Sequence, residues 1–350
     1  MNVSDLDQRR NKILEIVVEE YVDTAAPVGS ELISRKLRQN LSPATIRHIM
    51  VELEKAGLLE QPHTSAGRIP TDRGLRFYVD SVMQVRHLSP DETRQLEALI
   101  KPEEGELVQL LERASQTLAD LSQQAAFVVA PTVKHSRVKQ IELVPLGLRK
   151  LLCVLIANDE MIVSHAVEIE APLSRDELGA LARFINAELV GLPFHDLLDS
   201  LERRLLAERD SFYHLVKQSL TILQHALSME PEDRLFLEGT SYVVAQPEFN
   251  KDVRKAHALL KHLESQEELL AYLRQDLAAE TVRVRIGHEV PFPGFEGCSY
   301  LTAPFSLGGE IVGGVGVLGP KRMNYPRVRA LVEGMAHSIT ELLARWEAGA

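Results

Sequence analysis

Apolar side chains in residues 42–57 recur with the spacing of one helical face. They fall at positions i, i+3, i+4 and i+7, which predicts a single buried stripe made of Ile46, Ile49, Met50 and Leu53. Ser42 is a favoured N-cap residue, Pro43 suits the first helical position, and Gly57 stands where a glycine commonly ends a helix. The pattern therefore predicts one short helix with both of its ends marked.

The opposite face of this helix carries no catalytic residue type and nothing too bulky to enter a groove. Projection at about 100° per residue places on it Ala44, Arg47, His48, Val51 and Lys55, with Thr45 at the edge. Most polar helix faces are simply solvated, but residues of these types also suit the major groove of DNA. The neighbouring segments decide between the two interpretations.

Two further helices are predicted before this segment. Residues 4–23 begin with a capping box and continue a helical apolar stripe, and a second, shorter helix begins at Ser30 and ends near Gln39. A turn of a few residues joins this second helix to the helix that begins at Ser42. The order is typical of a helix-turn-helix, in which the last helix lies in the major groove of DNA.

A hairpin is predicted directly after the third helix. Residues 58–61 and 68–69 have strand character, and residues 62–67 between them are rich in turn formers. The residues at the tip that suit phosphate or minor-groove contacts are His63, Thr64, Ser65 and Arg68. Such a hairpin is the wing of a winged helix, and Thr71 and Asp72 then start a further helix that continues to Val82.

Charge supports a nucleic-acid partner. Residues 35–76 carry eight basic against four acidic side chains, whereas residues 1–34 carry three basic against seven acidic ones. The whole chain of 350 residues has a formal net charge of −11. A basic surface on an acidic chain is the electrostatic pattern expected of a protein that binds nucleic acid.

The remaining chain changes from strand to helix and back to strand. Residues 85–91 are a predicted linker, and helices follow at 92–100 and 104–124. Later strands are predicted at 138–144, 150–157, 161–170, 281–286, 298–306 and 310–318, and later helices at 175–189, 194–227, 252–263, 266–277 and 325–346. A compact sheet needs more strands than the first group offers, so we expect both groups of strands to share one α+β domain that an insertion interrupts.

The helix predicted at 194–227 carries too many leucines for a narrow stripe. These side chains either form the core of the insertion or face a second copy of the chain. The candidates for dimer contacts are Leu201, Leu205, Phe212 and Leu215. Two-fold pairing would present two third helices to half-sites separated by multiples of roughly 34–36 Å.

The first 80 residues resemble the N-terminal winged helix of the heat-inducible transcription repressor HrcA family. The matching stretches are 28–30, 41–47 and 53–80, and the match is most specific at the hairpin. Two positions depart from the family pattern, because His48 replaces an asparagine and Leu75 replaces an aromatic residue.

This resemblance implies an α+β protein of several domains, with a GAF-like domain interrupted by a mainly helical dimerisation insertion. We expect the winged helix and a linker helix at 1–86, GAF-like segments at 87–172 and 276–350, and the insertion at 173–275. The resemblance also implies a repressor of chaperone operons. Such a repressor binds, as a homodimer, an inverted repeat in double-stranded DNA called CIRCE, and the chaperonin GroEL keeps it active.

In this interpretation the third helix reads bases and the hairpin holds the backbone. Arg47 and His48 are expected at base edges, with guanine as the partner of Arg47, and Ala44 or Val51 could meet thymine methyl groups. The residues expected on the backbone or in the minor groove are Lys55, His63, Thr64, Ser65 and Arg68, and Ser42 and Thr45 belong to the same surface at the start of the helix.

Signals for enzymatic chemistry are weak or absent. Residues 314–319 match GxGxxG, but Pro320 follows and strand alternation persists, so we expect glycines that allow close packing rather than a dinucleotide site. Cys153 and Cys298 are far apart in the sequence, and no HExxH, GxSxG or P-loop motif occurs. We therefore expect buried thiols, no metal, no cofactor and no enzymatic activity.

The sequence contains no stretch that approaches the roughly 18 apolar residues of a membrane span, and its N-terminus lacks the layout of a signal peptide. We therefore expect a cytoplasmic protein that does not contact a membrane. The alternative function is a small-molecule-sensing transcription factor whose GAF-like domain binds a ligand. No concentrated set of polar and aromatic residues names such a ligand.

Overall fold

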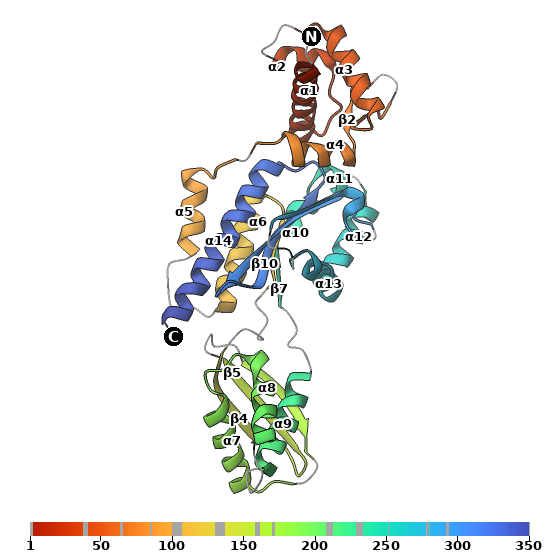
Figure 1. Cartoon of the computed structure of the whole chain (residues 1–350). Helices are drawn as coiled ribbons and strands as arrows, with labels where there is room; N and C mark the ends of the chain where they lie inside the picture. The colour runs from red at the N-terminus through yellow and green to blue at the C-terminus, as the bar shows by residue number, and fades with distance from the viewer. Residues whose placement is uncertain are drawn as a thin grey trace.

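The computed structural model shows three bodies arranged one after another (Figure 1). The N-terminal body comprises helices and a small hairpin, the sheet body lies in the middle, and the inserted body lies at the far end. The structure describes residues 3–37, 41–63, 66–84, 86–99, 107–129, 137–157, 162–169, 172–207, 213–228, 234–250, 252–277, 279, 281–291 and 294–349.

The N-terminal body has the order of elements that the sequence predicts. Its elements are α1 (Val3–Thr24), α2 (Ser30–Lys36), α3 (Pro43–Lys55), β1 (Leu59–Glu60), β2 (Ile69–Pro70), α4 (Asp72–Phe77) and the π-helical turn η1 (Tyr78–Val82). The Thr71 hydroxyl caps α4 by accepting a hydrogen bond from the Gly74 N–H. Strands β1 and β2 pair antiparallel, as expected for a hairpin.

The sheet body is built on a five-stranded antiparallel sheet with the order β7-β3-β10-β9-β8. Its strands are β3 (Ala125–Val129), β7 (Leu235–Glu238), β8 (Arg283–Ile286), β9 (Cys298–Leu307) and β10 (Glu310–Pro320). Alternate residues face two separate cores: Ala126 and Val128 lie in one, and Phe127 and Val129 lie in the other. This alternation is what a sheet covered on both faces requires.

Helices cover the two faces of this sheet (Figure 1). The helices on one face are α5 (Pro90–Leu99), α6 (Leu107–Ser122) and α14 (Tyr325–Gly349). Those on the other side are α10 (Thr240–Val244), α11 (Pro247–Asn250), α12 (Val253–Glu264) and α13 (Gln266–Leu277). Gly316 of β10 lies close to the neighbouring strand β9, because an added Cβ would lie 2.3 Å from the Leu301 carbonyl oxygen. The GxGxxG stretch is therefore a packing feature within a strand.

The inserted body has a sheet and a core of its own. Its elements are β4 (Val138–Pro145), β5 (Lys150–Ala157), β6 (Ile162–Glu168), α7 (Arg175–Leu189), η3 (Phe194–Asp196), α8 (Leu197–Ala207) and α9 (Tyr213–Ser228). The strands form a meander in the order β4-β5-β6. Ile141, Cys153 and Val167 face the helices and share a core with Leu181 and Leu223.

This packing corrects the expected organisation of the chain. The strands at 138–168 do not join the strands at 283–320 in one sheet, because they bury their apolar face against α7–α9. The expected boundary between 172 and 173 falls between β6 and α7, which share that core. The expected boundary at 275 falls inside α13, whose leucines pack against the five-stranded sheet. By packing, the insertion extends from β4 to α9.

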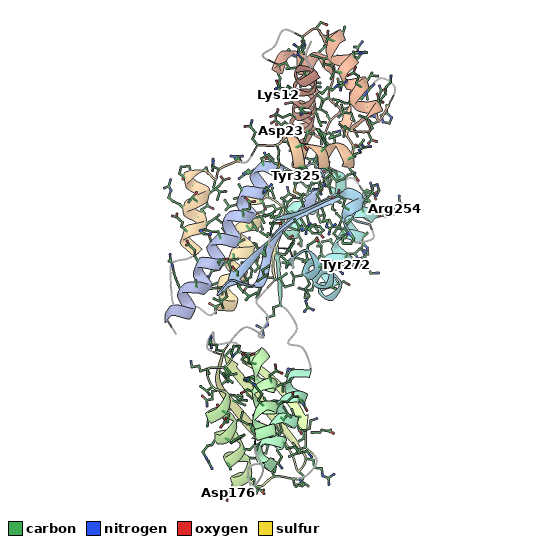
Figure 2. The ribbon with its side chains drawn as sticks, viewed as in Figure 1. Lys12, Asp23, Asp176, Arg254, Tyr272 and Tyr325 are labelled. Carbon is green, nitrogen blue, oxygen red and sulfur yellow. The ribbon has the colours of Figure 1, made fainter. Side chains whose placement is uncertain are left out.

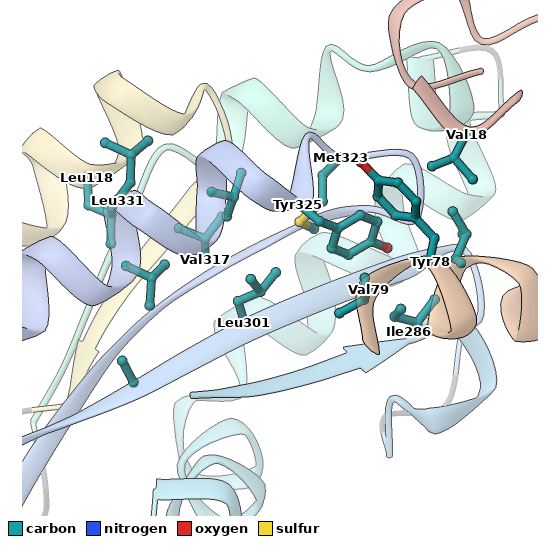
Figure 3. Packing of buried hydrophobic residues seen from close by; sticks show 14 of the residues in the cluster. Val18, Tyr78, Val79, Leu118, Ile286, Leu301, Val317, Met323, Tyr325 and Leu331 are labelled. Atoms are coloured by element: carbon teal, nitrogen blue, oxygen red, sulfur yellow. The ribbon is translucent and has the colours of Figure 1, made fainter. Parts of the chain in front are cut away.

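The N-terminal body is docked on the sheet body through an apolar contact ringed by ion pairs. Figure 3 shows Tyr78 and Val79 of η1 packed near Tyr325 and Ile286 within one continuous core. Around this contact, the Lys321 ammonium lies 2.6 Å from the Asp72 carboxylate. Arg76 pairs with Glu289, and its guanidinium also donates to the Val284 carbonyl of the edge strand β8 (2.5 Å). The position of α4 relative to the sheet is therefore fixed by both packing and charge.

Candidate nucleic-acid interface

Helix α3 is defined by the caps that the sequence marks. The Ser42 hydroxyl accepts a hydrogen bond from the Thr45 N–H (3.1 Å), and Pro43 occupies the first turn. Gly57 adopts a φ of +73°, a left-handed conformation that suits glycine after a helix. The predicted limits of this helix are confirmed.

The apolar stripe of α3 is buried against α1 and α2. Its members, each at most 6% exposed, are Ile46, Ile49, Met50 and Leu53. They belong to the same core as Ile13 and Val17 of α1 and Ile33 of α2. Their burial leaves the helix no freedom to rotate about its axis, so the opposite face must point outward.

The outward face carries the residues expected to meet DNA. The exposed members are Ala44, Thr45, Arg47, His48 and Lys55, and Val51 is half-buried at the edge. The Ser42 and Thr45 hydroxyls lie 2.9 Å apart at the start of the helix. The structure thus places every α3 residue of the predicted surface on a single side of the helix.

An ion pair that the sequence analysis did not predict holds α3 to α1. Arg10 donates two hydrogen bonds to one oxygen of Glu52, from Nε at 3.0 Å and from Nη2 at 2.7 Å. This bonding, with the Arg10 and His48 charges adding to it, holds the pKa of the Glu52 carboxyl below its usual range. The other oxygen lies 3.3 Å from His48 Nε2, so the imidazole is oriented by its i+4 neighbour. The i,i+4 spacing of His48 and Glu52 in the sequence predicts this second contact. The pairing of Glu52 with Arg10 joins residues 42 positions apart, so no local pattern predicts it.

A hydrogen bond joins the two ends of the segment between α2 and α3. The Ser34 hydroxyl of α2 donates to the Leu41 carbonyl oxygen (3.0 Å), which sets the approach of the chain to α3. Residues 38–40 within this turn lie outside the described residues.

The base of the hairpin is bound to the loop between α1 and α2. Val28 and Arg68 exchange two backbone hydrogen bonds of 2.9 Å. Gly67 is needed beside this bridge, because an added Cβ would lie 2.3 Å from the Val28 carbonyl oxygen. At the tip, His63 is exposed, whereas Thr64 and Ser65 lie outside the described residues.

We expected the Arg68 guanidinium to be exposed for contact with phosphate, and the structure corrects this expectation. Its side chain is only 14% exposed and pairs with Glu54 near the end of α3. Nε donates to Glu54 Oε2 at 3.0 Å, and Nη2 lies 2.9 Å from the same oxygen. A charge-assisted pair of this kind fixes the hairpin against α3, so the geometry gives Arg68 a positioning role.

The structure contradicts one of the four expected dimer contacts and does not describe the side chains of the other three. Leu201 is 1% exposed and belongs to the core of the inserted body, so the prediction that it faces a partner is wrong. Its burial against the same chain already uses its apolar surface. Leu205 and Leu215 lie in α8 and α9, but their side chains, like the whole of Phe212, are outside the described residues.

The described residues give little support for a reactive thiol, a metal site or a membrane span. Cys153 and Cys298 are buried and unpaired with each other, and burial raises the pKa of both thiols to about 12. Within the described ranges, no three His, Cys, Asp or Glu side chains come together in a way that could hold a metal ion. The helices that can be described include none long and apolar enough to cross a membrane.

Comparison with known proteins identifies the family. A family model described as the HrcA protein C-terminal domain matches residues 108–328. The heat-inducible transcription repressor HrcA of Symbiobacterium thermophilum is 35% identical over 337 residues, which cover 96% of this chain and 98% of that protein. The HrcA of Natranaerobius thermophilus is 37% identical over 339 residues, 97% of each chain.

A solved structure supports the fold over the full length. A crystal structure described only as that of a hypothetical protein aligns with a TM-score of 0.60 at 22% identity, covering 97% of this chain and 98% of that one. The matches with named relatives extend over the N-terminal, sheet and inserted bodies alike. The chain belongs to the HrcA family of heat-inducible transcription repressors.

Proposed function

We propose that this protein represses chaperone operons by binding an inverted-repeat operator, CIRCE, through a winged helix-turn-helix formed by its N-terminal body. The observation that carries the proposal is the outward face of α3, which is polar, basic and fixed by the burial of the opposite face. The full-length relatives named as heat-inducible transcription repressors support the same conclusion.

In the proposed complex, α3 lies in the major groove and the hairpin follows the adjacent backbone. Arg47 donates two hydrogen bonds to a guanine, His48 contacts a neighbouring base, and Ala44 and Val51 meet thymine methyl groups. The residues that hold phosphate or minor groove are Ser42, Thr45, Lys55, His63, Thr64 and Ser65. Arg68 acts indirectly, by holding the hairpin on Glu54.

A homodimer explains how one short helix reads a long operator. A single α3 covers few base pairs, whereas two copies related by a two-fold axis match the two halves of an inverted repeat. We assign the contact to the outer face of the β4-β5-β6 sheet, opposite the face that packs on α7–α9.

The outer face has the composition of an interface. Leu152, Val154 and Ile156 of the central strand β5 point away from the buried core and remain half-exposed. Val144, which pairs across from Leu152, is 43% exposed. The exposed Glu142 pairs across from Val154 on one side and the exposed Ser164 on the other, so polar side chains border this apolar row.

The proposal that GroEL keeps this protein active rests on the resemblance to the family. A chain built from several bodies, of which the inserted body has a core of its own, has an active fraction that is sensitive to temperature. Heat that occupies the chaperonin with other clients would then lower the active population and release repression.

Replacing Arg47 by alanine tests the base contact. We expect a loss of about 1–3 kcal/mol in operator binding and weaker discrimination against substituted half-sites, because a bidentate guanine contact is removed. Fluorescence anisotropy with labelled operator and scrambled duplexes measures both effects. Arg94→Ala, at an exposed position of α5, is the matched control. Unchanged affinity and selectivity for Arg47→Ala would refute the assignment.

The pair Arg68 and Glu54 allows a direct contact to be distinguished from positioning. If Arg68 holds the hairpin, Glu54→Gln and Arg68→Ala should each weaken binding to all sequences by a similar factor, and the double variant should lose little more. If Arg68 instead neutralised a phosphate, removing the Glu54 charge would strengthen binding. Titrations of both single variants and the double variant against operator DNA decide between these results.

The dimer face is tested by introducing charge at its centre. Val154→Arg should convert the dimer to a monomer in sedimentation experiments, because an unpaired charge would be buried between the sheets. Val190→Arg, at a 49% exposed site in the same body, should remain dimeric. A folded Val154→Arg protein that still sediments as a dimer would place the contact elsewhere.

Refolding tests the role of the chaperonin. The protein is unfolded, diluted at several temperatures with or without GroEL and ATP, and titrated with operator DNA. We expect a larger DNA-binding fraction with the chaperonin, and the difference should grow on warming. Protein that was never unfolded gives the reference, and equal fractions at every temperature would contradict the proposal.

A further inference from the structure

Helix α12 presents a basic face that the proposed contacts do not use. Its apolar side is buried in the sheet body through Ala256, Leu259 and Leu263. Its outer side carries the exposed residues Arg254, Lys255, His257 and Lys261. The Arg254 side chain is 97% exposed, and its Nε lies 3.9 Å from the Asp252 carboxylate.

The position of two of these cations, Arg254 and Lys255, opposes helix stability. Arg254 and Lys255 occupy the first turn of α12, where the positive end of the helix dipole disfavours positive charge. Asp252 caps the helix by accepting a hydrogen bond from the Arg254 N–H (3.1 Å), but no acidic residue follows in that turn. Local rules that are broken without a structural gain commonly mark functional residues.

The N-terminal end of α12 lies close to the N-terminal body. Helix α11 directly precedes it, and Arg322 joins α11 to α1 by pairing with Glu248 and donating to the Val22 carbonyl oxygen (2.9 Å). Burial, together with the charges of Glu248 and of Glu60 in the hairpin, raises the pKa of Tyr21. Glu248 of α11 and Glu60 of the hairpin therefore both lie near the C-terminal end of α1.

Figure 2 shows Arg254 projecting on the side of the molecule where Figure 1 places α3, away from Lys12 and Asp23 of α1. In this view α12 and α3 therefore lie on the same side of the molecule, one on the sheet body and the other on the N-terminal body. Glu248 of α11 is already paired with Arg322, whereas Asp252 at the N-cap of α12 and the exposed Glu60 of the hairpin are acidic residues near the ends of the two basic segments.

We propose that the exposed face of α12 binds phosphates of double-stranded DNA beyond the segment held by α3 and the hairpin. The inference rests on the DNA binding proposed above and adds a second point of contact for each protomer. Lys and Arg side chains without fixed hydrogen-bond geometry suit phosphates of any sequence. The contact therefore increases affinity and salt dependence and leaves sequence selectivity unchanged.

The test compares two triple variants of the full-length protein. In the first, Arg254→Gln, Lys255→Gln and Lys261→Gln remove the charges of α12. In the matched control, Arg175→Gln, Arg203→Gln and Lys217→Gln remove three exposed charges of the inserted body. Each is titrated at several salt concentrations with a duplex carrying the CIRCE repeat and long flanks, and with a duplex trimmed to the repeat.

On the long duplex, the α12 variant should bind roughly 10-fold or more weakly at moderate salt, and its log–log salt slope should fall by about 0.9 for each contact removed. The control should match the wild type. On the trimmed duplex the wild type and the α12 variant should become equal. Thermal stability of the α12 variant should be unchanged or slightly higher, which excludes unfolding as the cause.

Three results would overturn the proposal. The first is a salt slope on the long duplex equal to that of the wild type, which would assign α12 to an acidic protein partner or to solvent. The second is an equal loss by the control variant. The third is a loss that persists undiminished on the trimmed duplex. Arg47→Ala, measured alongside, separates these results from a failure of DNA binding itself, because it should weaken binding to both duplexes.

Discussion

The burial of one face of α3 is the constraint on which the N-terminal body depends. Ile46 and Met50 are enclosed by α1 and α2, so the orientation of the helix is set by the hydrophobic core and not by its polar residues. The polar face is then stiffened by two ion pairs, one from Glu52 to α1 and one from Glu54 to the hairpin. A recognition surface gains from such rigidity, because less conformational entropy is lost on binding.

The same core continues beyond the N-terminal body. Tyr78 joins it to the sheet body, Asp72 of α4 is paired with Lys321, which follows β10, and Arg76 is paired with Glu289, which follows the edge strand β8. Helix α3 therefore has a defined position relative to the five-stranded sheet. The inserted body, in contrast, buries its apolar residues in a core of its own. This division separates the proposed reading of DNA from the proposed pairing of two copies.

Local patterns in the sequence predicted the parts of the fold that are determined locally. The caps at Ser42 and Gly57 and the pairing of the hairpin follow from residue types within a few positions of each other. The assignment of 138–168 failed because period-2 alternation identifies the two faces of a strand and says nothing about which sheet the strand joins. The prediction that Leu201 contacts a second copy failed for a related reason, because an apolar position on a helix suits a core and an interface equally. The partner of Arg68 is 14 positions away in the sequence, so only the fold brings the two together.

The central claim is that two copies of α3 occupy the two halves of an inverted repeat. Hydroxyl-radical footprinting of the wild-type protein on the DNA upstream of its own gene tests this most directly. The account predicts two protected regions related by symmetry, separated by whole turns of the double helix. Protection of a single continuous stretch without symmetry, or no protection at concentrations that saturate scrambled DNA, would contradict it.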